Sequence, residues 1–247
     1  MITIKSKEEI KIMRRAGKIV GDTLKLIEDN IRAGMTTQSL DALAYNYIVK
    51  RGAEPSFLGF DGYPASICVS IDDEVVHGIP GKRVILEGQL VSVDIGAVID
   101  GFHGDAARTF MIGRVADARR KLVSVCEQSF FEGVKAIRID GRIGDISQAI
   151  QTYVEANGFS VVRELVGHGI GRQMHEEPNV PNYGKAGHGF RLENGMTIAI
   201  EPMINLGGRA VEIQEDGWTV VTVDGSPSAH YENTVAITDD GVEILTL

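Results

Sequence analysis

The stretch Val91–Phe110 constrains the fold of this chain most strongly, because it places an Asp-Gly pair between two apolar, β-branched runs. Asp-Gly flanked in this way is the strongest short-range signal for a two-residue hairpin turn. With Asp100-Gly101 as the turn, Asp94 faces Ala107, and Asp105 shares the face of Ala107 because side chains repeat every second residue. The two carboxylates are then diagonal neighbours, with Cβ atoms about 7–8 Å apart.

Two readings of this aspartate pair follow. Aspartate is disfavoured in strands, and two buried like charges are costly without a partner. A cation between the carboxylates would supply that partner. On an exposed sheet face, water would solvate the same two side chains, so the rest of the chain must decide between the readings.

Composition excludes several classes of protein. The chain has 247 residues, a formal net charge of −9 and no dense block of Lys and Arg, which argues against a nucleic-acid partner. Two cysteines provide neither a disulfide framework nor a thiolate metal pair. The N-terminus lacks the apolar run of a signal peptide, and no segment reaches membrane-spanning length. We therefore expect a cytoplasmic protein without a membrane partner.

Helical periodicity occurs in two pairs of segments. The first pair covers residues 7–29, capped by Ser6 and Glu9, and residues from Thr36 or Thr37 to Gly52. The second pair covers Ala118–Ile137 and a shorter segment from Asp145 to Gly158. Aligning Gly52 with Gly158 also aligns Tyr47 with Tyr153 and Leu40 with Ile146, which indicates an internal duplication.

A β region follows each helix pair. In the first half, strands are expected around Ser66–Ile71 and Gln89–Ile99, with a return strand from about Phe102; in the second half, around Ser160–Val166, Met196–Met203, Trp218–Val223 and Thr234–Ile237. This order predicts one α+β domain over residues 1–247, with pseudo-symmetric helix-helix-β halves at about 1–112 and 113–247. A central antiparallel sheet built from both halves, with the helices on its outer face, would leave a cleft on the other face.

The second half supplies acids at points that correspond to Asp94 and Asp105. Glu201 ends the apolar run 198–200, and Glu232 precedes the last strand. His168 follows a strand among three glycines, where a neutral imidazole could act as a ligand. Each glutamate alone is also typical of a surface strand, and a lone histidine is usually structural. Together, four carboxylates and one imidazole suit a pair of divalent ions such as Mn, Fe, Co or Zn, which could jointly polarise a carbonyl.

The remaining histidines have weaker signals. His77 and His175 lie in turn-rich segments, and His175-Glu176 is not part of an HExxH zinc motif because Pro178 breaks the required helix and residue 179 is Asn. We expect His103 and His188 to be surface residues. The sequence leaves His230 undecided.

Seven residues in their local motifs resemble the type I methionine aminopeptidases over essentially the whole chain: His77, Asp94, Asp105, His168, His175, Glu201 and Glu232. The resemblance implies the pita-bread fold around two divalent metal ions (Co, Mn, Fe or Zn). It implies that Asp94 is bidentate to one ion, that Asp105 and Glu232 bridge both, and that His168 and Glu201 bind the other.

The same resemblance implies roles around these ligands. Glu201 would shuttle a proton, His175 would stabilise the oxyanion, and His77 would contact the scissile amide. The methionine pocket would include Tyr63, Cys68 and Trp218, with Phe57, Phe60 and Met174 nearby, although plain core packing is the alternative for each. A monovalent cation (Na or K) is implied near Ser228 and the loop before His77.

The implied activity is removal of initiator methionine from the N-terminus of nascent polypeptides, with a small second residue preferred, by a monomer; contact with the ribosome is left open. Two alternatives remain. Proline-specific aminopeptidases and dipeptidases use the same five ligands, but they usually carry a large N-terminal domain. Non-catalytic binding proteins share the fold but lose ligands, whereas all five candidate ligands are present here.

Overall fold

The computed structural model describes residues 2–247, and its two longest strands, β4 (Leu90–Ile99) and β5 (Phe102–Met111), form a hairpin. Asp94 pairs with Ala107, and Gly96 pairs with Asp105, which is the predicted register. Asp100 and Gly101 both have positive φ, 51° and 75°, as a two-residue type I′ turn requires. The sequence therefore specified this hairpin correctly.

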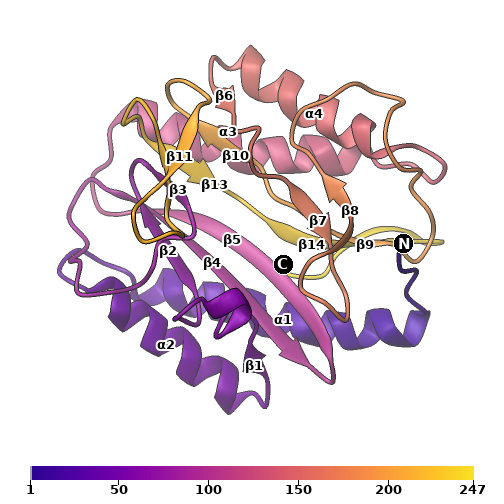
Figure 1. Ribbon diagram of the computed structural model, residues 1–247, viewed down its shortest axis with the longest axis horizontal. Helices are drawn as coiled ribbons and strands as arrows, with labels where there is room; N and C mark the ends of the chain where they lie inside the picture. The colour runs from indigo at the N-terminus through magenta and orange to yellow at the C-terminus, as the bar shows by residue number, and fades with distance from the viewer. Residues whose placement is uncertain (1) are drawn as a thin grey trace.

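Two helix pairs lie on opposite sides of the strands in Figure 1. The first pair is α1 (Lys7–Asn30) and α2 (Thr37–Lys50), and the second is α3 (Asp117–Lys135) and α4 (Ile143–Ala156). The second helix of each pair has 14 residues and is followed by a glycine with positive φ, Gly52 or Gly158. The repeated element order agrees with two similar halves, while their common origin stays a prediction.

The helix starts follow local capping. Ser6 and Glu9 form the predicted capping box at α1. The cap of α4 was predicted three residues too late, at Asp145, whereas its N-cap is Arg142. The Asp145 carboxylate instead accepts the backbone N–H of Arg142 from within the first turn, at 2.8 Å.

Backbone hydrogen bonds divide the β structure into four sheets. One contains β1 (Glu54–Pro55), β2 (Cys68–Ile71), β4 and β5, and the 3-10 turn η1 (Phe60–Gly62) follows β1. The five-stranded sheet has the order β15 (Gly241–Ile244), β14 (Asn233–Thr238), β9 (Thr197–Ile200), β7 (Gly167–Gly169) and β8 (Glu176–Val180). Two three-stranded sheets are formed by β3 (Glu74–Val76), β11 (Val211–Ile213) and β12 (Val220–Thr222), and by β6 (Ser160–Val161), β10 (Met203–Asn205) and β13 (Ser228–His230).

Two predicted strands differ from the observed ones. The strand expected over Met196–Met203 is interrupted at Glu201-Pro202, which separates β9 from β10. Proline has no N–H for a ladder hydrogen bond, so the interruption has a local cause. The strand expected over Ser160–Val166 is only two residues long, because the ladder with β10 includes only Ser160 and Val161.

The halves meet where β5 passes the segment before β14, a boundary that we call the seam. Backbone hydrogen bonds run in both directions between Ala107 and Glu232, at 3.3 and 3.0 Å. The Thr234 hydroxyl accepts the N–H of Asp105 and donates to its carbonyl, both at 2.9 Å. These bonds, together with the ladder between β3 of the first half and β12 of the second, join the two halves of the expected central β region.

Each half has a large apolar core. One buries side chains of α1 and α2 against β2, β4 and β5, and the other buries side chains of α3 and α4 against β6, β9, β10 and β14. Helices thus cover the outer face of both β regions, and the inner side holds the cavity described next. Within residues 2–247, no helix is both long and apolar enough to cross a membrane.

Candidate metal centre

The four predicted acids and His168 line a single internal cavity of about 100 Å³. Asp94 and Asp105 come from the paired strands β4 and β5, while Glu201 and Glu232 flank the seam from the second half. The hairpin register places the two aspartates on one face. Folding therefore brings together residues that lie up to 138 positions apart in the sequence.

Glycines on both sides of His168 allow β7 to approach its neighbours closely. A Cβ at position 167 would lie 2.4 Å from the carbonyl oxygen of Ala199, and one at position 169 would lie 2.2 Å from that of Glu177. His168 Nδ1 lies 2.8 Å from its neighbouring carbonyl at residue 169, so this nitrogen carries the proton and donates it. The lone pair on Nε2 is left for a ligand. Nε2 lies 3.9 Å from Asp105 Oδ2 and 3.7 Å from Glu201 Oε1.

The acids are poorly compensated by the protein itself. Buried oxygens of three of them, Asp94 Oδ1, Asp105 Oδ1 and Glu232 Oε1, have no hydrogen-bond partner. Burial raises the pKa of Asp94 to about 7. Burial, followed by the neighbouring carboxylates, raises the pKa values of Asp105, Glu201 and Glu232 well above their usual range.

Bound cations would offset the cost of burying these carboxylates close together. Positive charge among the carboxylates offsets their mutual repulsion and gives the unpartnered oxygens a ligand role. The imidazole of His168 suits the same function, because burial lowers its pKa to about 3 and keeps the ring neutral. The residues present therefore fit the divalent ions that the sequence pattern predicted.

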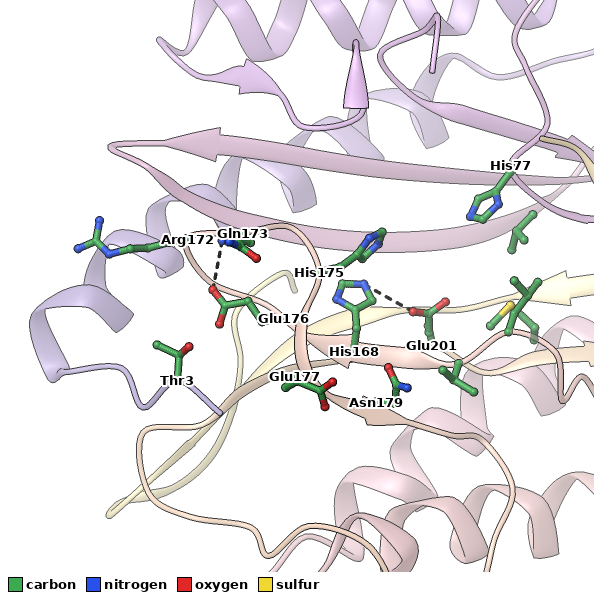
Figure 2. A pocket seen from close by; sticks show the side chains of 14 residues that line it. Thr3, His77, His168, Arg172, Gln173, His175, Glu176, Glu177, Asn179 and Glu201 are labelled. Atoms are coloured by element: carbon green, nitrogen blue, oxygen red, sulfur yellow. Dashed lines mark hydrogen bonds and ion pairs between the residues drawn. The ribbon is translucent and has the colours of Figure 1, made fainter. Parts of the chain in front are cut away.

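His77 and His175 lie where this cavity opens into a wider outer cleft of about 750 Å³. Figure 2 shows the His175 ring above that of His168, with Glu201 beside the latter. The His168 and His175 rings meet edge to face, with centroids 4.3 Å apart. Burial lowers the pKa of both His77 and His175, that of His77 to about 4, so both rings are neutral near pH 7.

The rest of the cavity lining is largely apolar. Tyr63, Cys68, Met174 and Phe57 are buried in one cluster, and Phe60 and Trp218 pack against it. The rings of Tyr63 and Trp218 meet edge to face with centroids 5.1 Å apart. The Tyr63 hydroxyl can donate to the carbonyls of Ile67 and Gly78, so its polar atom is directed into the protein. The predicted pocket residues thus form one surface beside the acids.

Two histidines need comment. The expectation that His103 is a surface residue was wrong: it is half-buried, with Nδ1 2.8 Å from Ser56 Oγ. The pairing of β1 with β4 brings Ser56 to this position, and no local pattern signals that contact. His188 is exposed, as expected.

Sequence reasoning left His230 undecided, yet its ring is buried against Glu201 and Glu232. Its position two residues before Glu232 is the signal that could have indicated a shared face. Sequence reasoning also missed the ion pair between Lys5 and Glu176, which are 171 positions apart. Ser228 donates its N–H to the carbonyl of Asp72, so it does lie beside the loop before His77; the monovalent cation there stays a prediction.

Comparisons with known proteins give consistent matches. The profile of metallopeptidase family M24 matches residues 11–239. A methionine aminopeptidase of Clostridium perfringens is 54% identical over 247 residues, covering 100% of this chain and 99% of the relative. The crystal structure of methionine aminopeptidase from Thermotoga maritima has a TM-score of 0.98 and 46% identity, covering 100% of this chain and 99% of that one. A prolidase from Pyrococcus furiosus, at 24% identity and a TM-score of 0.79, shares the fold; the match covers 99% of this chain and 65% of the prolidase.

Proposed function

Because this chain belongs to metallopeptidase family M24, and within it to the methionine aminopeptidases, we propose that its buried acids hold two divalent ions for removal of N-terminal methionine. The proposed ligands are Asp94, Asp105, His168, Glu201 and Glu232. The observation that carries the proposal is the placement of all five on one cavity that is also lined by a cluster of apolar side chains. Co, Mn, Fe and Zn all suit this mixed oxygen and nitrogen set.

When bound, the ions would polarise the first peptide carbonyl and make a water molecule more acidic. The other parts of the reaction are assigned to the chain itself. Glu201 faces both the cavity and the outer cleft, so its carboxylate is placed to take a proton from the attacking water and pass it to the leaving amine.

The two neutral histidines at the cavity mouth have supporting roles. His175 is proposed to donate a hydrogen bond to the oxygen on which negative charge develops, and His77 to contact the scissile amide. Both line the inner cavity and the outer cleft, so a peptide that extends from one into the other lies close to them. These positions support the assignments.

The cavity also accounts for the proposed specificity. The methionine side chain would pack among Tyr63, Cys68, Met174 and Trp218, while the cationic α-amine would lie near the carboxylates. An acetylated N-terminus lacks that charge and should be rejected. A small second residue is proposed from the family resemblance, because the cleft must close over that position. The substrates are then the free N-termini of new polypeptides, and we expect a monomer to bind them.

Cleavage of three peptides tests the proposal: Met-Gly-Met, Ala-Pro-Ala and N-acetylated Met-Gly-Met, with chelated protein refilled with Mn, Co, Fe or Zn. Metal-dependent cleavage of Met-Gly-Met alone is expected. Asp94→Asn should abolish activity and lower metal content while the protein stays folded. Asp100→Asn is the matched control, because it changes an exposed aspartate in the turn of the same hairpin, where asparagine tolerates positive φ.

Cleavage of Ala-Pro-Ala in place of Met-Gly-Met would retain the metal centre and overturn the pocket assignment. Inactivity with every metal would favour the binding-protein alternative. Full activity of Asp94→Asn would contradict the ligand assignment.

A further inference from the structure

His230 occupies a fixed position behind the acids. It is the last residue of β13, opposite Met203 of β10. Its backbone is also fixed on the other side, since its N–H donates to the Thr109 hydroxyl and its carbonyl accepts from it, both at 2.9 Å. The side chain is only 2% exposed. The position of this imidazole is therefore set by the fold.

The ring nitrogen Nε2 of His230 is buried without a hydrogen-bond partner. It lies 3.8 Å from Glu201 Oε2 and 3.8 Å from Glu232 Oε2, which is too far for a hydrogen bond to either carboxylate. A buried polar atom in this state is costly unless something else satisfies it. The three donor atoms lie within 4.8 Å of one another, as do those of Asp105, His168 and Glu232.

These separations match those around His168. Ligand atoms at about 2.0–2.2 Å from a tetrahedral ion lie about 3.3–3.6 Å from one another. His168 is 3.7 and 3.9 Å from its two acids, and His230 is 3.8 Å from both of its own. Small side-chain shifts would bring either histidine to ligand spacing. Glu201 lies between the two rings and Glu232 belongs to both donor sets.

We propose that His230 is a sixth metal ligand, so that the centre holds two imidazoles, with His168 on one side and His230 together with Glu201 and Glu232 on the other. This inference rests on the proposed function, because it concerns the same ions. A second nitrogen donor makes the site softer than four carboxylates and one imidazole, which shifts its preference from Mn towards Co, Fe and Zn.

Cobalt binding tests the proposal without reference to activity. Titration of metal-free protein with Co²⁺ gives the number of bound ions and their Kd values, and proton NMR of the loaded protein counts the imidazole N–H signals shifted by Co²⁺. We expect two ions and two shifted signals. His230→Gln should lose one signal and raise the Kd of one ion at least tenfold, since loss of outer partners alone costs about 10–100-fold. His103→Gln, which changes a half-buried histidine outside the cavity, should keep both signals.

A second variant separates ligation from support by hydrogen bonding. Glutamine retains an amide donor that could contact the two glutamates, whereas leucine retains none. Ligation predicts that His230→Gln and His230→Leu both weaken metal binding. Without metal, His230→Leu should unfold at the same denaturant concentration as the parent or a higher one, because it removes an unpartnered buried nitrogen.

Normal binding by His230→Gln together with weak binding by His230→Leu would overturn the proposal, as would a single shifted signal in the unmodified protein. If the unmodified protein binds two ions and the histidine variants do the same, only this inference fails. If the unmodified protein binds no Co²⁺, the proposed function fails with it.

Discussion

Lys5 and Glu176 form a buried ion pair, with Lys5 Nζ 2.5 Å from Glu176 Oε2 and side-chain exposures of 2% and 9%. Lys5 precedes α1, and Glu176 directly follows His175 at the start of β8. The same carboxylate accepts the N–H of Gln173 at 3.1 Å, and Lys5 also donates its N–H to the carbonyl of Gly195. The pair thus ties the start of the chain to the loop that carries a proposed catalytic histidine.

Lys5→Met should destabilise the protein by about 1–3 kcal/mol, because it leaves the partly buried Glu176 carboxylate without its charged partner. Lys7→Met is the matched control: Lys7 is 80% exposed and lies 3.8 Å from Asp239, so its loss should cost within about 0.5 kcal/mol. Denaturant unfolding of metal-loaded protein measures both. Equal destabilisation by the two variants would show that the pair of Lys5 and Glu176 stabilises the protein no more than an exposed ion pair does.

The stability of metal-free protein should fall as the pH rises above about 6.5, the ordinary pKa of histidine. The folded-state pKa of Asp94 is about 7, and those of Asp105, Glu201 and Glu232 are raised well above their usual range. Above about pH 6.5 the folded state binds more protons than the unfolded chain, so stability is lost as pH rises. Below pH 6.5, the lowered pKa values of the buried histidines act in the opposite direction.

Thermal unfolding with chelator should show this loss as a fall of several degrees in Tm, since each kcal/mol shifts Tm by about 2–4 °C in a chain of this size. Bound divalent metal should make Tm less dependent on pH. In the metal-free protein, Asp105→Asn should also reduce the dependence of Tm on pH. The control Asp100→Asn should not change the dependence of Tm on pH. A Tm that rises with pH in the chelated protein would contradict the burial of these acids.

Gly17→Ala should destabilise the protein, because α1 passes directly over the chain near its C-terminus. A Cβ at Gly17 would lie 2.1 Å from the carbonyl oxygen of Leu245, and backbone must move to admit it; overpacking of this kind costs about 1–3 kcal/mol. At Gly81, no atom lies within 4 Å of an added Cβ and φ is not positive. Gly81→Ala should therefore be neutral or slightly stabilising, by up to about 1 kcal/mol. Chemical unfolding of both variants decides whether the close approach at Gly17 matters.

Both cysteines should be inert to iodoacetamide in the native protein at pH 8. Burial raises the pKa of the Cys68 thiol well above its usual value, the charge of Asp94 adds to this, and burial likewise raises that of Cys126. The reactive thiolate is therefore scarce at both positions. Mass spectrometry should find no added group in the native state and two in denaturant; rapid native labelling of Cys68 would mean that the pocket is wider than the structure shows.

The parts of this fold that depend on contacts between residues close in sequence could be predicted from local sequence signals. The Asp100-Gly101 turn set the register that places Asp94 beside Asp105, and the capping pair Ser6 and Glu9 set the start of α1. Contacts between distant segments left no such signal. The seam between Ala107 and Glu232 and the half-buried state of His103 arise only when separate strands meet, so they required the structure.

For the candidate site, the sequence indicated which residues to consider better than it indicated how they are arranged in space. Asp105, His168 and Glu232 were named from their motifs, and they lie in one cavity. The role of His230 was left undecided, because the sequence pattern around a single histidine in a strand is the same whether it packs in the core or binds a metal ion. Lys5 was missed because lysine before a helix is ordinary, and its partner lies on another element.

The seam has a consequence for how this enzyme fails. Asp94 and Asp105 come from one side of it, and His168, Glu201 and Glu232 from the other, so neither half holds all five proposed ligands. A slip of β5 by one residue against its neighbour would turn Asp105 away from the cavity. A chain whose halves have docked wrongly therefore cannot assemble the centre. We therefore expect such chains to be inactive.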